Sequence, residues 1–227
     1  RAAQGAPAGS VIVADRQTAG RGSRGRRWLA APGASLTFSV LWRFDGGLER
    51  LAGLSLAVGV AVVHALDSCG AAGILLKWPN DVLYDNAKLG GILVELQSAE
   101  GGALAIIGIG LNLSLPESLG ECEGFALPPA ALDEIISPLP ERHILFAQLL
   151  IELAHVFDRF TQGGFAAVRD QWQARNAWQN RPVQVLRDGH LEMEGVCRGA
   201  DVDGALLVQT AAGVERCLSG DLSLRAA

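Results

Sequence analysis

The first half of the chain contains short segments in which apolar residues follow one another or alternate with polar ones, as they do in β-strands. Residues 10–15 (SVIVAD) form a short apolar run that predicts a buried strand. Residues 35–44 (SLTFSVLWRF) predict a longer, partly alternating strand, and residues 74–78 (ILLKW) predict another that ends at Pro79. We therefore expect a β-sheet in this half of the protein.

Two further strands are predicted from Lys88 onward. Residues 88–97 (KLGGILVELQ) and 103–113 (ALAIIGIGLNL) are apolar runs, and the SAEGG stretch between them is typical of a hairpin connection. The segment from about 114 to 140 is rich in Pro and Glu and predicts irregular structure.

Helical spacing of Leu, Ala and Val predicts a helix from residue 48 to about 69, ended by Gly70. Its longest apolar run, residues 51–66, falls short of the roughly 20 residues that cross a membrane, so we expect a buried helix. Two more helices are predicted, a strongly amphipathic one at 141–160 and another at about 164–178.

The pattern changes at Pro182. From there the chain has short β-type runs separated by DG, DVDG and AAG, which predicts a small barrel of short strands. We therefore expect a domain boundary near residue 180, with one domain at 1–180 and a second at 181–227.

Composition narrows the class of protein. The chain has 227 residues, 49% of them apolar, which suits a globular protein with a sizeable core. The formal net charge of −5 argues against a general nucleic-acid binder, and the first residues do not resemble a secretory signal. The chain does not begin with Met, so we expect residues upstream of Arg1. Widely spaced cysteines favour reduced thiols in the cytoplasm over a zinc site or disulfides: Cys69, Cys122, Cys197 and Cys217.

Residues 17–28 (QTAGRGSRGRRW) place four arginines and three glycines in twelve positions. The GRGSRG stretch has the spacing of a dinucleotide fingerprint, but a strand follows it where that fingerprint needs a helix. Arginines and glycine backbone amides can surround a phosphate or carboxylate, and Trp28 can stack on a base. A solvated basic turn or an RNA contact of the RGG type is the alternative.

Two other segments carry polar residues at unusual places. In residues 76–95 (LKWPNDVLYDNAKLGGILVE), Asn80 and Asp81 follow a strand that Pro79 ends, and Lys88 precedes two glycines. These residues can also be ordinary turn formers and a surface lysine. Asn112 lies inside an apolar strand, where it must find hydrogen-bond partners.

Together and in this order, the three segments resemble the signatures of the biotin protein ligases (biotin–[acetyl-CoA-carboxylase] ligases). The end of the chain, from 181 to 225, resembles the SH3-like C-terminal domain of that family, so the resemblance covers about residues 10–225. It implies an α/β (α+β) catalytic domain, with a mixed sheet and flanking helices, followed by a small SH3-like barrel.

The resemblance also implies a reaction. The carboxylate of biotin attacks the α-phosphate of ATP with Mg²⁺, giving biotinyl-5′-AMP, and a lysine of the biotin carrier domain of a carboxylase then takes the biotin. Positive charge would offset the repulsion between the two reacting anions, and a closing loop would protect the adenylate from water. The resemblance further implies a cytoplasmic enzyme and allows a homodimer, and this segment predicts neither a membrane span nor a DNA-binding domain.

Site residues are implied position by position. The resemblance assigns to biotin Gln17, Gly20, Arg21, Gly22, Ser23 and Lys88. It assigns to ATP Arg24, Arg26, Trp28, Asn80, Asp81, Asn112 and Arg225. Lys88 is expected to be the main electrostatic catalyst, helped by Arg21 and by Asp81, and Asp81 is the expected Mg²⁺ ligand.

Two features depart from the family pattern. Ser23 stands where the family usually has a second loop arginine, which predicts weaker retention of the adenylate. The family's upstream STN motif is absent from the 227 residues, and any upstream winged-helix domain would lie outside them. Three alternatives remain: a lipoate or octanoate ligase, a biotin sensor without catalytic activity, and a nucleic-acid-binding module.

Overall fold

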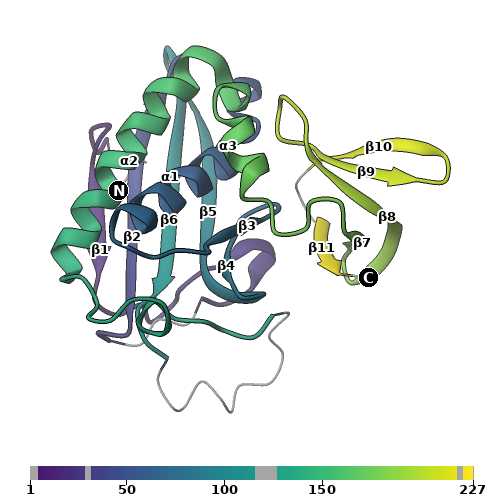
Figure 1. Cartoon of the computed structure of the whole chain (residues 1–227). Coiled ribbons are helices and arrows are strands. Elements are labelled where there is room, and N and C mark those ends of the chain that lie inside the picture. Colours follow the sequence, from purple (N-terminus) through teal and green to yellow (C-terminus); the bar gives the residue numbers. More distant parts are fainter. Residues whose placement is uncertain (1–4, 29–31, 116–126, 219–221, 227) are drawn as a thin grey trace.

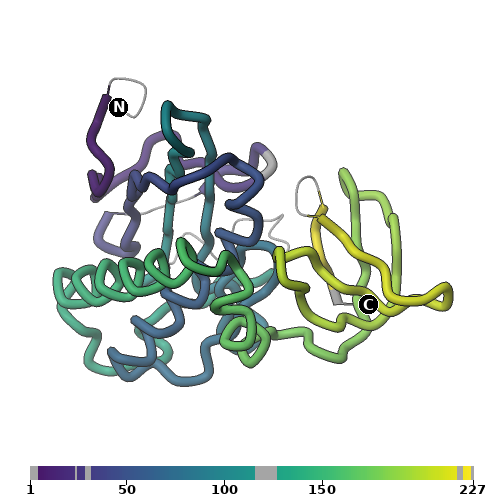
Figure 2. The backbone as a smooth tube through the Cα atoms, turned by 90° about the horizontal axis from the view of Figure 1, so that it is seen from above, coloured from purple at the N-terminus to yellow at the C-terminus, as the bar shows by residue number. Residues whose placement is uncertain are grey.

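The structure is a computed structural model that describes residues 5–28, 32–115, 127–218 and 222–226, with Arg24 and Ala226 described by their backbone alone. A six-stranded sheet with helices on one face forms the larger part (Figure 1). A five-stranded sheet lies beside it and contains the C-terminus (Figure 2). The predicted α/β class, with flanking helices and a small C-terminal β unit, is confirmed.

The larger sheet is built of antiparallel neighbours. In spatial order its strands are β1 (Val11–Ala14), β2 (Ser35–Phe44), β6 (Gly102–Asn112), β5 (Ala87–Ala99), β4 (Asp81–Tyr84) and β3 (Leu75–Lys77). Two isolated parallel bridges, Leu76 to Asn176 and Lys88 to Pro129, attach later segments to it. The hairpin predicted at residues 98–102 joins β5 to β6, and Ala99 pairs with Gly102 at its tip.

The prediction of a buried strand at 10–15 is wrong in one respect. Strand β1 forms, but it is the outer strand of the sheet, and the side chains of Val11, Ile12 and Val13 are all exposed, Ile12 to 47%. The apolar run therefore forms an edge strand and not a central one. An edge strand has a neighbour on one side only, so its valine side chains can remain in contact with solvent.

Strand β4 was not predicted from the sequence. Pro79 does end β3, but the chain turns through Asn80 and resumes pairing at once, with Asp81 opposite Lys77. A second tight turn follows, in which Asp85 and Asn86 adopt φ values of 46° and 62°. Asp and Asn tolerate this left-handed region better than other side chains, so two hairpins fit into about fifteen residues.

The long apolar segment forms a short 3₁₀ turn (Leu48–Leu51) and then helix α1 (Leu54–Ser68). Gly53 separates the two with φ +77°, and a Cβ there would lie 2.6 Å from Cβ of Phe165. By length and composition alone, Leu48–Ser68 could cross a membrane, but 67% of its most apolar window is buried inside the protein. The predicted buried helix is thus confirmed as the centre of the core.

Helix α2 (Arg142–Gly163) covers the same face of the sheet as α1. Phe146 of α2 contacts Phe38 with ring centroids 5.1 Å apart, and Phe157 contacts Phe44 at 5.6 Å. The even-numbered side chains of β2 therefore face the helices, and the odd-numbered ones face the opposite side. The helix predicted at 164–178 is shorter than expected: a 3₁₀ turn (Gly164–Ala167) precedes α3 (Arg169–Ala174).

The C-terminal strands pair in an antiparallel sheet of order β10-β9-β8-β7-β11. They are β7 (Pro182–Arg187), β8 (His190–Ala200), β9 (Leu206–Thr210), β10 (Gly213–Cys217) and β11 (Leu222–Ala226). The buried indole of Trp78 donates a hydrogen bond to the carbonyl of Gly204, 3.1 Å away, and so joins the two sheets. Cys69, Cys197 and Cys217 are free thiols, and Cys122 lies outside the described residues.

Candidate active site

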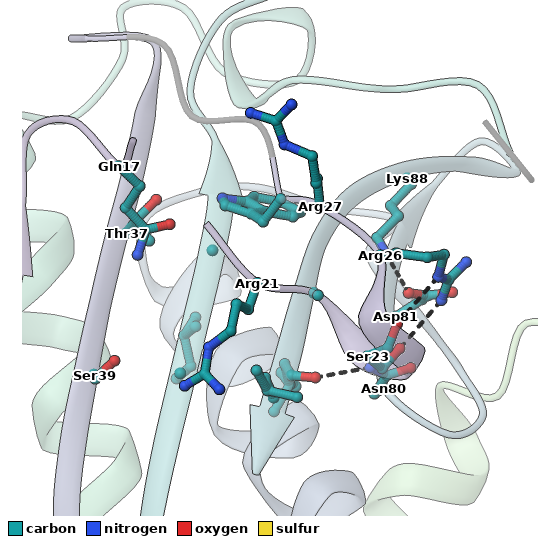
Figure 3. A pocket seen from close by; sticks show the side chains of 18 of the residues that line it. Gln17, Arg21, Ser23, Arg26, Arg27, Thr37, Ser39, Asn80, Asp81 and Lys88 are labelled. Atoms are coloured by element: carbon teal, nitrogen blue, oxygen red, sulfur yellow. Dashed lines mark hydrogen bonds and ion pairs between the residues drawn. The ribbon is translucent and has the colours of Figure 1, made fainter. Parts of the chain in front are cut away.

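A cavity of about 680 Å³ opens on the face of the large sheet that the helices leave uncovered (Figure 3). Its walls come from the arginine-rich loop, strands β2, β5 and β6, and the turn that leads into β4. Ten of the site residues predicted from the sequence line this cavity: Gln17, Arg21, Gly22, Ser23, Arg26, Trp28, Asn80, Asp81, Lys88 and Asn112.

The floor of the cavity follows the register of the sheet. Directly paired positions on neighbouring strands run from β2 to β3 in one line, which we term the central row: Thr37, Gly110, Gly91, Asp81 and Lys77. Paired side chains point to the same face of a sheet, so the two glycines leave a gap between a hydroxyl at one end and charged groups at the other. The pairing alone thus creates an open floor with polar ends.

The arginine-rich loop folds back on itself over this floor. The amide of Trp28 donates to the carbonyl of Gly20 (3.0 Å), and the amide of Gly22 donates to the carbonyl of Arg26 (2.7 Å). A Cβ at Gly20 would lie 2.4 Å from the carbonyl oxygen of Trp28, so this close approach requires glycine. Gly20 does not line the cavity but shapes the loop that does.

The loop arginines have different partners. The guanidinium of Arg26 donates to the hydroxyl of Ser23 (3.1 Å) and to its carbonyl (3.3 Å), as Figure 3 shows. The Arg21 guanidinium pairs with Glu95 of β5 at 3.0 Å, although the Arg21 side chain is 71% exposed. An exposed pair of this kind contributes little to stability, so Arg21 can exchange Glu95 for a ligand at small cost. The side chain of Arg24 lies outside the described part.

Trp28 lies against the central row. A Cβ at Gly110 would come within 2.5 Å of two indole carbons, and one at Gly91 within 3.8 Å of a third. The indole nitrogen of Trp28 is buried and has no hydrogen-bond partner among the described residues. The gap over the two glycines therefore accommodates the ring and leaves its N–H for another acceptor.

Asp81 carries the strongest electrostatic feature of the site. Asp81 is 5% exposed, and its carboxylate lies 2.8 Å from Nζ of Lys77 and 2.5 Å from Nζ of Lys88. Burial alone would raise the pKa of Asp81, but the attraction of the two ammonium groups outweighs it and lowers the pKa from 3.8 to about 2. The Asp81 carboxylate is thus held ionised between two ammonium groups, and that of Lys88 lines the cavity.

Asn80 and Asn112 differ in their bonding. Asn112 donates from its amide to the carbonyls of Lys88 (3.3 Å) and Ala130 (3.0 Å), so it holds the chain segments around the cavity together. Asn80 donates to the carbonyl of Ile92 (2.8 Å), while its own side-chain oxygen is buried without a partner among the described residues. That oxygen is available to a bound group.

The donor set fits Mg²⁺ in the manner usual for nucleotide sites. Mg²⁺ is commonly held through one or two carboxylates together with substrate phosphates and water. Asp81 offers a carboxylate in the cavity, whose two oxygens Mg²⁺ would share with Lys77 and Lys88, and Asn80 offers an oxygen without a partner among the described residues. In the described ranges, no group of three or more His, Cys, Asp and Glu residues forms a self-contained metal site.

Sequence reasoning missed several lining residues. Thr37 and Ser39 face the cavity from β2, and the hydroxyl of Thr37 is buried with no hydrogen-bond partner in the described structure. The signal was present, because small polar residues occupy alternate positions of an otherwise apolar strand. Arg27, Gly91, Gly108 and Gly110 also line the cavity. Arg225, by contrast, lies on β11 and is not among the lining residues.

The sequence of this chain matches known protein families and individual relatives. Residues 2–112 match the Biotin/lipoate A/B protein ligase family, and residues 180–225 match the Biotin protein ligase C terminal domain. The chain is 36% identical to bifunctional ligase/repressor BirA of Escherichia coli, over 96% of this chain and 67% of that protein. It is 34% identical to biotin–[acetyl-CoA-carboxylase] ligase of Paracoccus denitrificans, over 93% of this chain and 88% of that protein.

Comparison with solved structures gives the same family as the sequence matches. Biotin protein ligase from Aquifex aeolicus in complex with biotin and ATP superposes with a TM-score of 0.82 at 29% identity, over 98% of this chain and 91% of the other. The chain therefore belongs to the biotin protein ligase family.

Proposed function

We propose that the protein is an ATP-dependent ligase that activates biotin as biotinyl-5′-AMP and transfers it to a lysine of the biotin carrier domain of a carboxylase. The observation that carries this proposal is the position of Lys88, which lines the cavity next to Asp81 and opposite a loop of arginines. The named activities of the relatives and the biotin and ATP of the Aquifex aeolicus complex support the same reaction.

The charges suit a reaction between two anions. An oxygen of the biotin carboxylate attacks the α-phosphorus, the bond from that phosphorus to the bridging oxygen breaks, and pyrophosphate leaves. Lys88 and Arg26 line the cavity and would supply positive charge where the carboxylate and phosphate oxygens meet. Mg²⁺ bound with ATP would neutralise phosphate charge, and Asp81 and Asn80 are the residues that would hold it.

The second step is an acyl transfer. The carrier's lysine nitrogen attacks the acyl carbon of the adenylate, the carbon–oxygen bond to AMP breaks, and the amine loses a proton. The loop at 17–28 folds over the central row, so it is well placed to keep water from the adenylate before the lysine arrives.

Polar atoms without partners mark where the substrates would bind. We assign the Thr37 hydroxyl, together with Gln17, to the biotin end of the cavity, and the Asn80 oxygen and the Trp28 N–H to the nucleotide end. A buried polar atom that lacks a hydrogen bond costs free energy, and a ligand that supplies the bond recovers it. Arg24 and Arg225 remain proposed ATP contacts.

We also propose the finer organisation of the protein. A division at residues 1–180 and 181–227 is supported by the start of the second sheet at Pro182 and by the family match from residue 180. A homodimer is supported by the exposed, unpaired edge of β1. A cytoplasmic location is supported by the free thiols of Cys69, Cys197 and Cys217.

The test is biotin-dependent exchange of labelled pyrophosphate into ATP, with lipoate in a parallel reaction because the matched family includes lipoate ligases. Exchange with biotin alone is the expected result. Exchange with lipoate alone would show that the protein is a lipoate ligase and not a biotin ligase. Exchange with neither substrate would refute the adenylation step.

A further inference from the structure

Lys77 is the last residue of the central row and is nearly as buried as Asp81. Its side chain is 7% exposed, and it does not line the cavity. Its ammonium lies 2.8 Å from one carboxylate oxygen of Asp81, while Lys88 lies 2.5 Å from the other oxygen (Figure 3 shows the Asp81–Lys88 pair). Asp81 thus pairs with Lys88, which lines the cavity, and with Lys77, which does not.

Lys77 has a second contact besides Asp81. The ring of the buried Trp178 lies 5.3 Å from its ammonium, close enough for a cation–π contact. The amide of Leu76 donates to the carbonyl of Arg175 (2.7 Å), and the amide of Ala177 donates to the carbonyl of Leu76 (2.9 Å). These bonds hold the segment with Trp178 against β3, so the Lys77 ammonium contacts both a tryptophan ring and a carboxylate.

The balance of charge depends on this second lysine. With both lysines present, each oxygen of Asp81 has its own ammonium partner, Lys77 on one and Lys88 on the other. Without the Lys77 ammonium, the buried carboxylate of Asp81 would be matched by Lys88 alone. A carboxylate in a poorly hydrated place holds its nearest cation strongly, so Lys88 would then be neutralised by Asp81 and withheld from the substrates.

We propose that Lys77 is a positioning residue for adenylation, which occupies one oxygen of Asp81 so that Lys88 can act on the reacting carboxylate and phosphate. Lys77 touches neither substrate in this arrangement and acts through Asp81. The inference rests on the proposed ligase activity and names a residue that neither the loop motif nor the cavity lining identifies.

The experiment compares Lys77→Met, which keeps the length of the side chain without its charge, with Lys77→Arg, which keeps the charge. Biotin-dependent pyrophosphate exchange is measured for each, with binding of biotin and of ATP by calorimetry. In Lys77→Met, kcat should fall between about 10- and 100-fold, the cost typical of a misplaced reacting group. Its KM values should change by no more than about threefold, and Lys77→Arg should recover most of the loss.

A matched control is Arg175→Met. Arg175 pairs with Asp67 at 2.6 Å, is partly buried, and lies near β3 without lining the cavity. Its replacement should lower the unfolding temperature and leave kcat within about twofold of wild type. If Lys77→Met behaves like this control, with a lower unfolding temperature and an unchanged kcat, then Lys77 has only a structural role and the inference is overturned.

A second comparison applies if Lys77→Met folds poorly. Asp81→Asn with Lys77→Met removes both charges of the pair, so it leaves neither a buried carboxylate nor a buried ammonium without its partner. Asp81→Asn alone, in which the Lys77 ammonium loses this carboxylate, is the reference for it. If Lys77 acts through Asp81, adding Lys77→Met should change the residual kcat by less than about twofold. A further loss of tenfold or more would show a direct role and overturn the inference.

The two proposals fail separately. A wild-type protein without biotin-dependent exchange refutes the ligase activity and the inference with it. A wild-type protein that is active, together with a fully active Lys77→Met variant, refutes the role of Lys77 only.

Discussion

The indole of Trp28 and the backbone of Gly110 are in direct contact across the cavity floor, with no room for a methyl group between them: a Cβ at Gly110 would lie 2.5 Å from Cε2 and Cζ2 of the ring. Gly110→Ala should therefore displace Trp28 and loosen the arginine-rich loop that it ends. Because this loop carries trypsin sites, its tryptic cleavage should become several-fold faster, and kcat/KM for ATP should fall about tenfold.

Gly108→Ala is the matched control for this substitution. Gly108 also lies on β6 and lines the cavity, but a Cβ there would make only ordinary contacts, 3.6 Å or more from its neighbours. It should leave tryptic cleavage of the loop unchanged. Equal cleavage rates in Gly110→Ala and Gly108→Ala would contradict the view that Gly110 anchors the loop.

Trp28→Ala should mainly weaken ATP binding, since it removes an aromatic surface for the base. Loss of one base–aromatic contact costs about 1–3 kcal/mol, which corresponds to an increase of between about 5- and 150-fold in the Kd for ATP. Calorimetric titration with a nonhydrolysable ATP analogue measures it. An unchanged affinity would leave Trp28 with packing on Gly110 as its role.

Ser23→Arg should slow the release of the adenylate. In the present loop Ser23 accepts a hydrogen bond from Arg26, whereas an arginine at this position would add a charged donor for the adenylate. Hydrogen bonds to charged groups contribute about 1.5–3 kcal/mol, so the off-rate of biotinyl-5′-AMP should fall by tenfold or more. Ser23→Gln serves as the control of similar size without charge. Identical off-rates in wild type and Ser23→Arg would contradict the prediction.

Lys88→Ala should abolish adenylation and leave the fold intact. The Lys88 side chain is 28% exposed, and Lys77 continues to pair with Asp81 in its absence. We expect a loss of at least about 100-fold in the rate of pyrophosphate exchange, with a change in the free energy of unfolding of about 1 kcal/mol. Urea denaturation beside the exchange assay measures both quantities. Near-normal turnover would remove Lys88 from the mechanism.

Asp81 should also contribute to the pH dependence of stability. Its pKa is lowered from 3.8 to about 2 in the folded protein. A lowered pKa contributes stability that is complete above the unfolded value and is lost as the pH falls through the folded value. Between about pH 5 and about pH 3, wild type should therefore lose about 1 kcal/mol more than Asp81→Asn in the free energy of unfolding. Parallel losses in urea denaturation would show that Asp81 is not held ionised.

The sequence predicted most of the fold because its apolar patterns agree with its turn residues. The strand at 35–44, the hairpin at 98–102 and the buried helix ending before Gly70 all combine an apolar period with glycine or polar residues at the ends. Strand β4 escaped prediction because four residues between two tight turns give too short a pattern. The exposure of β1 escaped it because burial depends on neighbours in space.

The candidate site could be predicted as a set of residues but not as an arrangement. The three segments that carry it are each visible in the sequence, yet the line from Thr37 through Gly110 to Asp81 arises only from the register between strands. The same holds for the contact of Lys77 with Asp81, from which we infer its role. The line of paired residues joins strands that are far apart along the chain, so no local pattern contains it. Lys77 and Asp81 are only four residues apart, but the sequence does not show that the turn between them brings the two side chains together.

The hydrogen bond from Trp78 to Gly204 has a consequence for how such proteins can be recombined. The indole belongs to the same turn as Asn80 and Asp81, so this turn rests partly on the loop of the C-terminal sheet. Gly204 has φ +84°, and a Cβ there would come within 2.6 Å of Cα of Gly53. A C-terminal unit grafted from a relative must therefore have a glycine at this position, with its carbonyl facing the indole. Chimeras that lack it should keep the arginine-rich loop but displace the turn that carries Asn80 and Asp81.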